Sequence, residues 1–395
     1  MKNKLLINVA PLRSPLTGIG YYTLNILSEL LSRELDIVGV KNGVILNRIQ
    51  LEELVNSFLH TENTPVKVPK TTRFIVETLR SIPGVYSIKN KLLSIRSKNN
   101  LSKLADQSYV YFEPSFIPFD YNGITITTIH DLSFITHPDF HPATRVDYLQ
   151  RKIEESISKT SHIIVDSHFI LEELNKYYPS TIGRSSCIYL GVAKSFKAYS
   201  QVECEPFLKS QRLGYKNFVL SVATLEPRKN LQQLIKAYKL LPNAVRQSNP
   251  LVLVGDQGWK NAELLDEAKS LIAAKQIVFT GYVSDEELKL LYASAKLFVY
   301  PSLYEGFGLP VIEAMASGVP VITSNIGATA EVSKGGATLV DPLDAVDIAN
   351  TMQKVLDDQE LQEKLALDGM ERAKAFTWKK TVDEILEVAS IATSR

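Results

Sequence analysis

Short runs of β-branched and other apolar residues alternate with helical patterns along the whole chain. Such alternation is typical of βαβ units, in which parallel strands are covered by helices. Between the first two predicted strands, Leu24, Leu27, Leu30 and Leu31 recur at the spacing of a helix that packs on a core. The pattern therefore predicts an α/β protein with parallel sheets.

The predicted strands fall into two series, separated at residues 193–215 by a segment without sustained periodicity, which we interpret as a linker. A chain of 395 residues is also too long for one ordinary core. We therefore predict an N-terminal domain over residues 1–195, a C-terminal domain over residues 196–375, and a last helix over residues 376–395 that packs back on the first domain. The predicted strands span residues 5–10, 37–40, 109–111, 124–129, 163–165 and 188–190 in the first series, and 218–222, 251–254, 277–279, 297–300, 319–323 and 338–340 in the second.

Composition narrows the class of protein. The net charge of +1 shows no bias toward nucleic acid, so we expect no nucleic-acid partner. Two cysteines, Cys187 and Cys204, suit a reducing compartment and exclude a disulfide framework. No apolar run approaches the roughly 18–20 residues that cross a bilayer, and the first residues lead into a strand rather than a secretion signal. We expect a cytoplasmic protein.

One segment departs from this balance. Residues 67–103 contain nine basic residues and one acidic residue, Glu77, interleaved with apolar residues. A basic amphipathic segment can lie on anionic lipid headgroups, which would give peripheral contact with the inner face of the cell membrane. A solvated helical face beside a groove explains the same pattern equally well.

The strongest candidate site follows the predicted strand at residues 297–300. Gly306 and Gly308 allow close backbone approach to a ligand, and Pro310 is suited to the first turn of a helix. The free N–H groups of such a helix start attract anions, and the carboxylates of Glu305 and Glu313 can accept hydrogen bonds from sugar hydroxyls. The alternative to a ligand site is that Glu305 is an ordinary loop residue and Glu313 only interacts with the helix dipole.

A second candidate site follows the strand at residues 218–222 and includes Arg228 and Lys229. A guanidinium fork beside an ammonium suits a diphosphate, although the same pair could be an ordinary surface feature. In open parallel sheets, ligands bind beyond the carboxyl ends of the strands. Both candidate sites are therefore expected at one edge of the second sheet.

Together these two segments resemble the large family of retaining glycosyltransferases with the GT-B fold, whose hallmark is two glutamates separated by seven residues. The resemblance covers nearly all of the second half, where residues 255–259, 280–285 and 323–325 also match. In the first half it rests on residues 17–21 and on His130 with Asp131. It implies two Rossmann-like domains that face each other across a cleft.

The resemblance also implies a role for individual residues. Arg228 and Lys229 would neutralise the departing nucleotide diphosphate, Glu313 would bind the ribose hydroxyls, and Glu305 would contact the transferred sugar. His130 would touch the sugar from the opposite domain, although a lone histidine at a strand end is often structural. The remaining implied contacts are backbone N–H groups at Phe307, Gly308 and Leu309 for the phosphate and sugar, Tyr282 and Val283 beside the base, and Gly18 and Gly20 near the phosphates or the acceptor.

One position departs from the family pattern. Many relatives carry a Gly-Arg pair at the end of the strand before Arg228, where this chain has Ala223 and Thr224. A phosphate contact of the family is therefore expected to be missing here, and Arg228 is the residue that could compensate for it.

The chain contains no Asp-x-Asp triplet, the metal-binding motif of the other major transferase fold. We therefore expect metal-independent transfer with retention of anomeric configuration and no cofactor beyond the nucleotide-sugar substrate. We expect Glu305 to orient the sugar for front-face attack rather than to form a covalent adduct. Residues 223–230 and 255–259 resemble mannosyltransferases of bacterial surface-polysaccharide assembly that use GDP-mannose, which implies a lipid-linked or oligosaccharide acceptor.

Three other functions are compatible with parts of the pattern. Residues 18–23 superficially begin a dinucleotide fingerprint, but Thr23 stands where a third small residue belongs, which argues against a nicotinamide dehydrogenase. A sugar-nucleotide epimerase on the same fold would form product without an acceptor. A non-catalytic nucleotide-sugar sensor would keep both binding segments and show no turnover.

Overall fold

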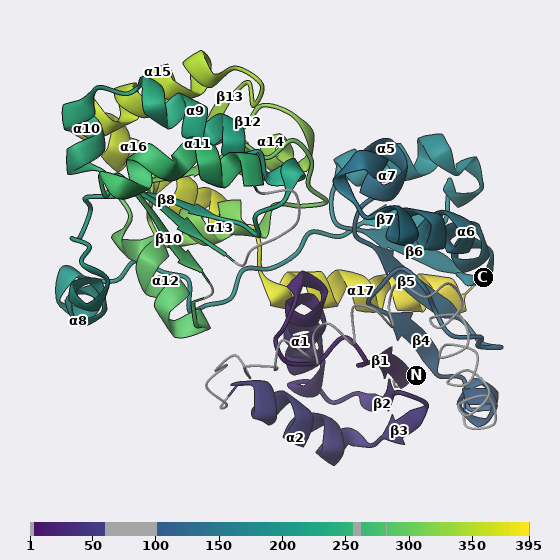
Figure 1. Cartoon of the computed structure of the whole chain (residues 1–395). Coiled ribbons are helices and arrows are strands. Elements are labelled where there is room, and N and C mark those ends of the chain that lie inside the picture. Colours follow the sequence, from purple (N-terminus) through teal and green to yellow (C-terminus); the bar gives the residue numbers. More distant parts are fainter. Residues whose placement is uncertain (1–3, 60–100, 256–261, 282, 395) are drawn as a thin grey trace, which may run out of the picture. The chain divides into compact units, whose positions relative to one another are not determined.

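The computed structural model describes residues 4–59, 101–255, 262–281 and 283–394 (Figure 1). Most of the predicted basic segment, residues 67–100, lies outside the described residues, as do Tyr282 and residues 256–259. The chain divides into two compact units. Unit 1 consists of Met1–Asp166, Ile170–Ile188 and Trp378–Arg395, and unit 2 of Ser167–Phe169 and Tyr189–Thr377.

Unit 1 contains a seven-stranded sheet with the order β3-β2-β1-β4-β5-β6-β7. All neighbouring strands are parallel except β2 and β3, which form a hairpin through Asn42 and Gly43, both with positive φ. The short strand β3 was not predicted, because three half-exposed residues give no clear alternation. The strands are β1 (Lys4–Asn8), β2 (Asp36–Lys41), β3 (Val44–Leu46), β4 (Val110–Glu113), β5 (Thr125–Ile129), β6 (His162–Val165) and β7 (Ser185–Cys187).

Helices pack along this sheet, and the last helix of the chain belongs to the same unit. The α17 helix contacts α1, and the rings of Tyr22 and Trp378 meet edge to face there. Just after the end of α1, Arg33 Nη1 lies 2.6 Å from Asp383 Oδ1 of α17. The described α-helices are α1 (Gly18–Leu31), α2 (Arg48–Leu59), α5 (Ser133–Thr136), α6 (Ala143–Lys159), α7 (His168–Tyr177, in unit 1 from Ile170) and α17 (Trp378–Thr393).

Unit 2 contains a six-stranded parallel sheet with the order β10-β9-β8-β11-β12-β13. The chain adds strands outward from β8 in one direction and outward from β11 in the other, so the topological switch point lies between these two strands. Loops that leave the carboxyl ends of β8 and β11 therefore diverge there, which is where open α/β sheets bind ligands. The strands are β8 (Val219–Val222), β9 (Leu251–Val254), β10 (Ile277–Gly281), β11 (Leu297–Tyr300), β12 (Val321–Ser324) and β13 (Thr338–Val340).

The helices of unit 2 include one that the sequence pattern did not predict. Within the expected linker, α8 begins with a capping box between Ser200 and Glu203 and buries Cys204 and Leu208 on one face. This short apolar stripe was too weak to register as periodicity, so the interpretation of residues 193–215 as a linker was wrong for α8. The helices are α8 (Gln201–Gln211), α9 (Leu231–Leu240), α10 (Asn243–Ser248), α11 (Ala262–Ala273), α12 (Asp285–Ser294), α13 (Leu309–Ala316), α14 (Gly327–Ser333), α15 (Ala345–Asp357) and α16 (Gln359–Ala373).

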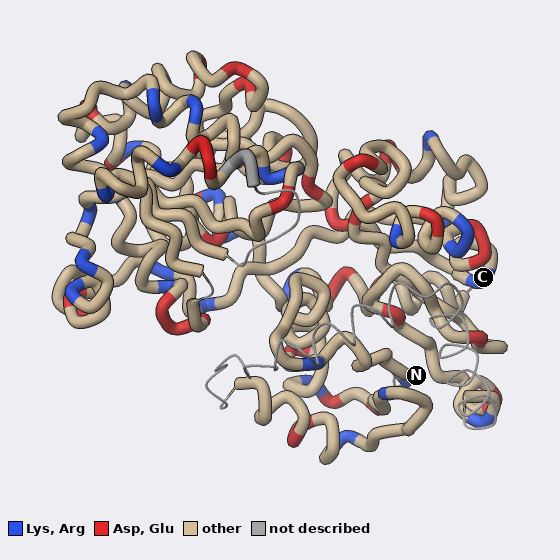
Figure 2. Tube along the Cα trace, in the orientation of Figure 1, with Lys and Arg blue, Asp and Glu red and all other residues tan. Residues whose placement is uncertain are grey.

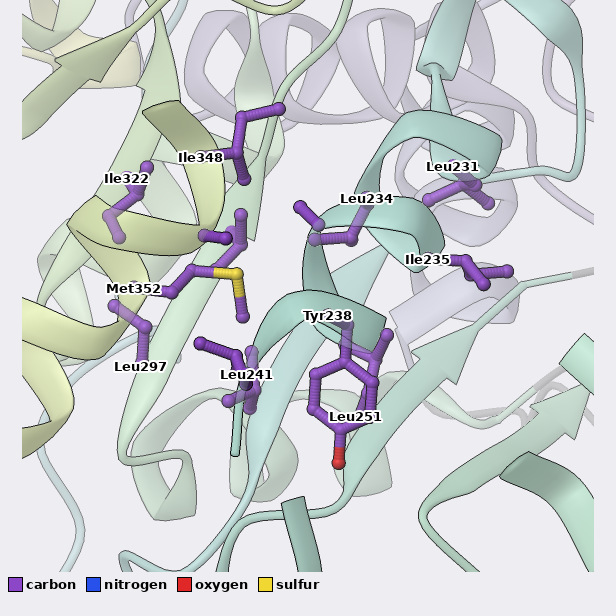
Figure 3. Close-up of a cluster of buried hydrophobic side chains, with 14 of the residues drawn as sticks. Leu231, Leu234, Ile235, Tyr238, Leu241, Leu251, Leu297, Ile322, Ile348 and Met352 are labelled. Atoms are coloured by element: carbon purple, nitrogen blue, oxygen red, sulfur yellow. The ribbon is translucent and has the colours of Figure 1, made fainter. Parts of the chain in front are cut away.

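The core of unit 2 fixes the start of α9 against the sheet. Leu234 and Tyr238 of α9 are fully buried with Met352 of α15 and with Leu251 and Ile322 of the strands (Figure 3). Burying a side chain of this size contributes about 1.5–3 kcal/mol. The turn between β8 and α9 is therefore anchored at both ends, which places Arg228 and Lys229 firmly.

Charged residues of both signs are interspersed along the described chain (Figure 2). Among the described helices, none combines the length and the apolar character that spanning a membrane requires. A capping box between Ser284 and Glu287 starts α12.

Candidate functional site

The turn after β8 is a short 3-10 helix, Pro227–Lys229, followed by Asn230 in the left-handed conformation. Asparagine tolerates this conformation better than most residues. The Asn230 side-chain amide donates to the carbonyls of Pro301 (3.0 Å) and Pro342 (2.6 Å). The turn is thereby tied to the segment that follows β11.

The loop after β11 is tied back to the same turn. The Leu303 N–H and the Ser302 hydroxyl both donate to the Arg228 carbonyl, at 2.8 and 2.9 Å. These contacts join the carboxyl ends of the two strands that flank the switch point of the sheet. The expectation that both segments lie at one edge of the second sheet is therefore confirmed.

Glu305 lies at the centre of this edge and is 7% exposed. Its Oε1 atom lies 2.6 Å from Lys229 Nζ, and its Oε2 atom lies 2.8 Å from Arg228 Nη1. The hydroxyls of Tyr300 and Ser302 each donate to Oε1 at 2.7 Å. Two cations and two hydroxyls therefore hold one buried carboxylate.

The electrostatics of this cluster follow from burial and charge. Burial alone would raise the pKa of Glu305, but the charges of Lys229 and Arg228 outweigh it and lower the pKa to about 2. Burial lowers the pKa of Lys229, although Glu305 opposes that shift. Arg228 is paired a second time, because its Nε atom lies 2.7 Å from Glu226 Oε1. The cluster thus holds two cations against two carboxylates.

The start of α13 continues this edge of the sheet. Gly308 precedes the helix with φ of +107°, a conformation that strongly favours glycine. A Cβ atom at Gly308 would also lie 3.1 Å from Thr329 Cγ2. No side chain caps the start of α13, and Pro310 occupies its first turn. Leu309 is the first helical residue, so its N–H belongs to the group of amides that can bind an anion.

Glu313 has a different environment from Glu305. It is the fifth residue of α13, and its Oε2 atom accepts from the Tyr292 hydroxyl of α12 at 2.9 Å. Burial raises the pKa of Glu313 to about 7, and the hydroxyl of Tyr292 only partly opposes this.

Two other predicted residues of unit 2 are described. Phe307 is buried, and its ring contacts those of Tyr189 and Phe376. This packing gives Phe307 a structural role in addition to any backbone contact with a ligand. Val283 is partly buried and lies two residues before α12.

The predicted residues of the first half lie in unit 1. Gly18 and Gly20 are in the first turn of α1, whose N-cap is Thr17. Gly18 is exposed, and a Cβ there would meet no atom within 4 Å. Gly20 is buried, and a Cβ there would lie 2.9 Å from Leu16 Cδ2. Close packing within unit 1 is thus sufficient to explain glycine at position 20.

His130 follows β5 directly and is held at both ring nitrogens. Its Nδ1 lies 2.7 Å from Asp166 Oδ2, and its Nε2 lies 2.9 Å from the Pro114 carbonyl oxygen. Burial tends to lower its pKa, but Asp166 and the carbonyl of Pro114 outweigh burial and raise it.

Several residues of these clusters were not predicted as site residues. They are Tyr300 and Ser302 beside Glu305, Glu226 beside Arg228, and Asp166 beside His130. Each lies at the end of a predicted strand or in the loop that follows, so position relative to the strands was the available signal. Chemistry alone did not distinguish them from ordinary loop residues.

Comparisons with known proteins identify the family. Residues 207–372 match the model described as "Glycosyl transferases group 1". Over 384 residues the chain is 31% identical to O-antigen chain mannosyltransferase B of Escherichia coli, which covers 97% of this chain and 98% of that protein. This chain belongs to the group 1 glycosyltransferases. The predicted enzyme class is therefore confirmed.

Other relatives agree with this assignment. This glycosyltransferase is 28% identical over 342 residues to O-antigen chain mannosyltransferase RfbU of Salmonella typhimurium, covering 86% of this chain and 87% of that protein. Two solved structures share its fold: WaaG, a glycosyltransferase involved in lipopolysaccharide biosynthesis (TM-score 0.70, 16% identity, 99% and 100% coverage), and sucrose-phosphate synthase from Thermosynechococcus elongatus (TM-score 0.72, 18% identity, 99% coverage of both). The predicted GT-B fold is confirmed.

Proposed function

We propose that this glycosyltransferase moves mannose from GDP-mannose to a growing glycan in O-antigen or related surface-polysaccharide assembly. Its match to an O-antigen chain mannosyltransferase extends over nearly the full length of both proteins, and a second relative carries the same description. Among the geometric observations, the contact of Arg228 and Lys229 with Glu305 at the switch point carries the proposal.

The donor diphosphate is assigned to the edge of the sheet between β8 and β11. Cleavage of a sugar–diphosphate bond leaves negative charge on the departing phosphate, and fixed cations and N–H dipoles stabilise that charge as it develops. Arg228, Lys229 and the uncapped start of α13 supply both kinds of group on neighbouring segments. Because Thr224 replaces the arginine found in many relatives, Arg228 would take over its phosphate contact.

Glu305 is assigned to orientation of the sugar. A carboxylate that accepts from two cations and two hydroxyls, and whose pKa is about 2, is weakly basic and a poor nucleophile. Retention would then follow from attack by the acceptor hydroxyl on the same face that the phosphate leaves. In this scheme Glu313 accepts hydrogen bonds from the ribose hydroxyls, and His130 of unit 1 contacts the transferred sugar.

The proposal includes metal-independent transfer without a further cofactor. Arg228 and Lys229 would supply the positive charge that a divalent cation supplies in enzymes with an Asp-x-Asp motif, which this sequence lacks. The acceptor would be a lipid-linked or oligosaccharide glycan. Residues 67–103 would then allow peripheral contact with the inner face of the membrane. Binding of the protein to anionic vesicles that weakens as salt is added would support this membrane contact.

The decisive experiment incubates the purified protein with GDP-mannose and a panel of lipid-linked acceptors, with and without EDTA. We expect an elongated glycan with an α-linked mannose, at a rate that EDTA leaves unchanged. UDP-glucose in place of GDP-mannose should give little product. Inverted configuration, strict dependence on a metal, or preference for another donor would each overturn the corresponding part of the proposal.

The alternatives formulated from the sequence have separate outcomes. An epimerase would convert GDP-mannose without an acceptor, and a sensor would bind the donor without turnover. Membership of a glycosyltransferase family does not favour either of them.

A further inference from the structure

His130 and Asp166 form a buried pair at the carboxyl edge of the unit 1 sheet. His130 follows β5, and Asp166 follows the neighbouring strand β6, so parallel pairing of these strands brings the two side chains together. Their side chains are 13% and 4% exposed, and the Nδ1–Oδ2 distance is 2.7 Å. A short contact between buried groups of this kind holds the imidazole in one orientation.

The second ring nitrogen determines which tautomers are allowed. Nε2 lies 2.9 Å from the carbonyl oxygen of Pro114, and a carbonyl can only accept. Nε2 therefore carries a proton, and His130 cannot accept a proton there. Protonation at Nδ1 as well would make the ring an imidazolium paired with the Asp166 carboxylate.

Of the other groups around His130, one adds negative charge and the other two are neutral. Asp131, the next residue, adds negative charge, and the ring of Tyr22 from α1 meets the imidazole edge to face with centroids 4.8 Å apart. The Tyr22 hydroxyl bonds to Thr128, and burial keeps its pKa far above the ordinary value, so Tyr22 is neutral. Phe116 packs on the ring from the loop after β4 and carries no charge.

Asp166 in turn depends on His130. In the described part of the chain, its Oδ1 atom is buried and has no hydrogen-bond partner. A buried carboxylate with one unpartnered oxygen is costly unless a positive charge compensates it. The imidazolium of His130 is the group in contact that can do so.

We propose that Asp166 is a positioning residue that holds His130 as an imidazolium, so that His130 acts in transfer as a fixed cation and not as a general base. The proposal rests on the proposed function for its catalytic part, while the ion pair itself does not. It explains why a histidine that would contact a neutral sugar is paired with a buried acid, which was not among the predicted site residues.

The pair is tested by NMR titration of the imidazole nitrogens in the full-length protein, with the His130 signals assigned by their absence in His130→Gln. In the wild type we expect His130 to titrate above 6.5 and, below its midpoint, to show both nitrogens protonated. In Asp166→Asn, which keeps the shape of the side chain, the midpoint should fall by about one unit or more. A wild-type midpoint at or below 6.5, or an unchanged midpoint in Asp166→Asn, would contradict the ion pair between His130 and Asp166.

The catalytic part is tested by the pH profile of mannosyl transfer. Asp166→Asn should lose rate as pH rises through the lowered midpoint of His130 and regain it at lower pH, which a purely structural defect would not produce. Asp36→Asn is the matched control, because it makes the same change in the same sheet at the amino end of β2, where Asp36 accepts from the Tyr109 hydroxyl. An unshifted profile in Asp166→Asn would overturn the positioning role even if the titration shows the pair. Absence of transfer by the wild type would instead contradict the proposed function and leave the titration result standing.

Discussion

Each unit buries a glutamate at the switch point of its sheet, beside β1 and β4 in unit 1 and beside β8 and β11 in unit 2. The two glutamates differ in what surrounds them. In unit 1, Glu113 at the end of β4 accepts from Asn8 at the end of β1 (2.7 Å) and from the hydroxyls of Tyr111 (2.6 Å) and Ser115 (2.7 Å). In unit 2, Glu305 accepts from hydroxyls and also from Lys229 and Arg228. Burial raises the pKa of Glu113 to about 7, whereas the two cations lower that of Glu305 to about 2.

The comparison shows that neutral donors alone do not offset the burial of a carboxylate. With the Ser115 N–H, which donates at 3.1 Å, Glu113 has four donors, as Glu305 does, so the opposite shifts come from the cations. The edge of unit 2 is thus built around cations that an incoming diphosphate can share. The edge of unit 1 carries the acidic residues Glu113, Asp131 and Asp166, and His130 pairs with Asp166. This edge suits a neutral, hydroxyl-rich ligand better than an anion.

The largest effect is expected from removing the charge of Glu305. Glu305→Gln should lower the rate of mannosyl transfer by about 10²–10³-fold, because Lys229 and Arg228 lose the partner that fixes them toward the donor. Steady-state kinetics with GDP-mannose measure this, and an unfolding curve of the variant verifies that it is folded. Transfer within a few-fold of wild type would show that the unit 2 cluster is only structural.

The same variant should change the acid stability of the protein. A carboxylate whose pKa falls on folding stabilises the fold above the unfolded pKa of about 4.5, and this stability is lost as pH falls toward about 2. A difference of this size corresponds to roughly 3 kcal/mol. Urea unfolding between pH 5 and pH 2 should therefore show a steeper loss in wild type than in Glu305→Gln. Parallel curves would contradict the ion-paired state of Glu305.

Glu113→Gln should change stability in the opposite pH range. Because the folded pKa of Glu113 is raised, its contribution is present below the unfolded pKa of about 4.5 and is lost as pH rises through about 7. Relative to the variant, wild type should lose roughly 3 kcal/mol across that range. Denaturation curves at pH 5 and pH 8 measure the difference. If the wild type and the variant differ in free energy of unfolding by the same amount at both pH values, Glu113 is ionised throughout and the contrast with Glu305 fails.

The smallest effect is expected at Glu313, whose pKa is raised to about 7 by burial. Only the ionised carboxylate can accept from both ribose hydroxyls, so donor affinity should rise about tenfold from pH 6 to pH 8 as the ionised fraction rises. Glu313→Gln should flatten this dependence. Calorimetric titration of GDP at the two pH values is the measurement. If the affinity of the variant depends on pH as much as that of the wild type, Glu313 does not bind the ribose.

Much of the unit 2 site was accessible from the sequence because it depends on strand order. Residues after β8 and β11 were predicted to share one edge, and the contacts of Arg228 and Lys229 with Glu305 show that they do. The direct ion pairing itself was not predicted, because the spacing between motifs does not indicate which cation meets which carboxylate. The same holds for Asp166, which the pairing of β5 with β6 brings to His130.

The errors in the predicted fold have local causes. The α8 helix was missed because it buries little more than Cys204 and Leu208, and β3 because it is a three-residue hairpin strand. Strand boundaries shifted by up to three residues, as at residues 188–190, where the structure has β7 at Ser185–Cys187. Short elements with weak burial are set by tertiary contacts that periodicity does not reveal.

Calorimetric titration of GDP can show whether the diphosphate of the donor binds at the Lys229 edge of unit 2. Lys229→Met should weaken binding by at least about tenfold, the loss of one charged hydrogen bond. Lys216→Met is the matched control, because Lys216 is also a largely buried lysine of unit 2 but donates to the Ala295 carbonyl away from the cluster. Equal affinity of wild type and Lys229→Met, or an equal loss in both variants, would contradict the assignment.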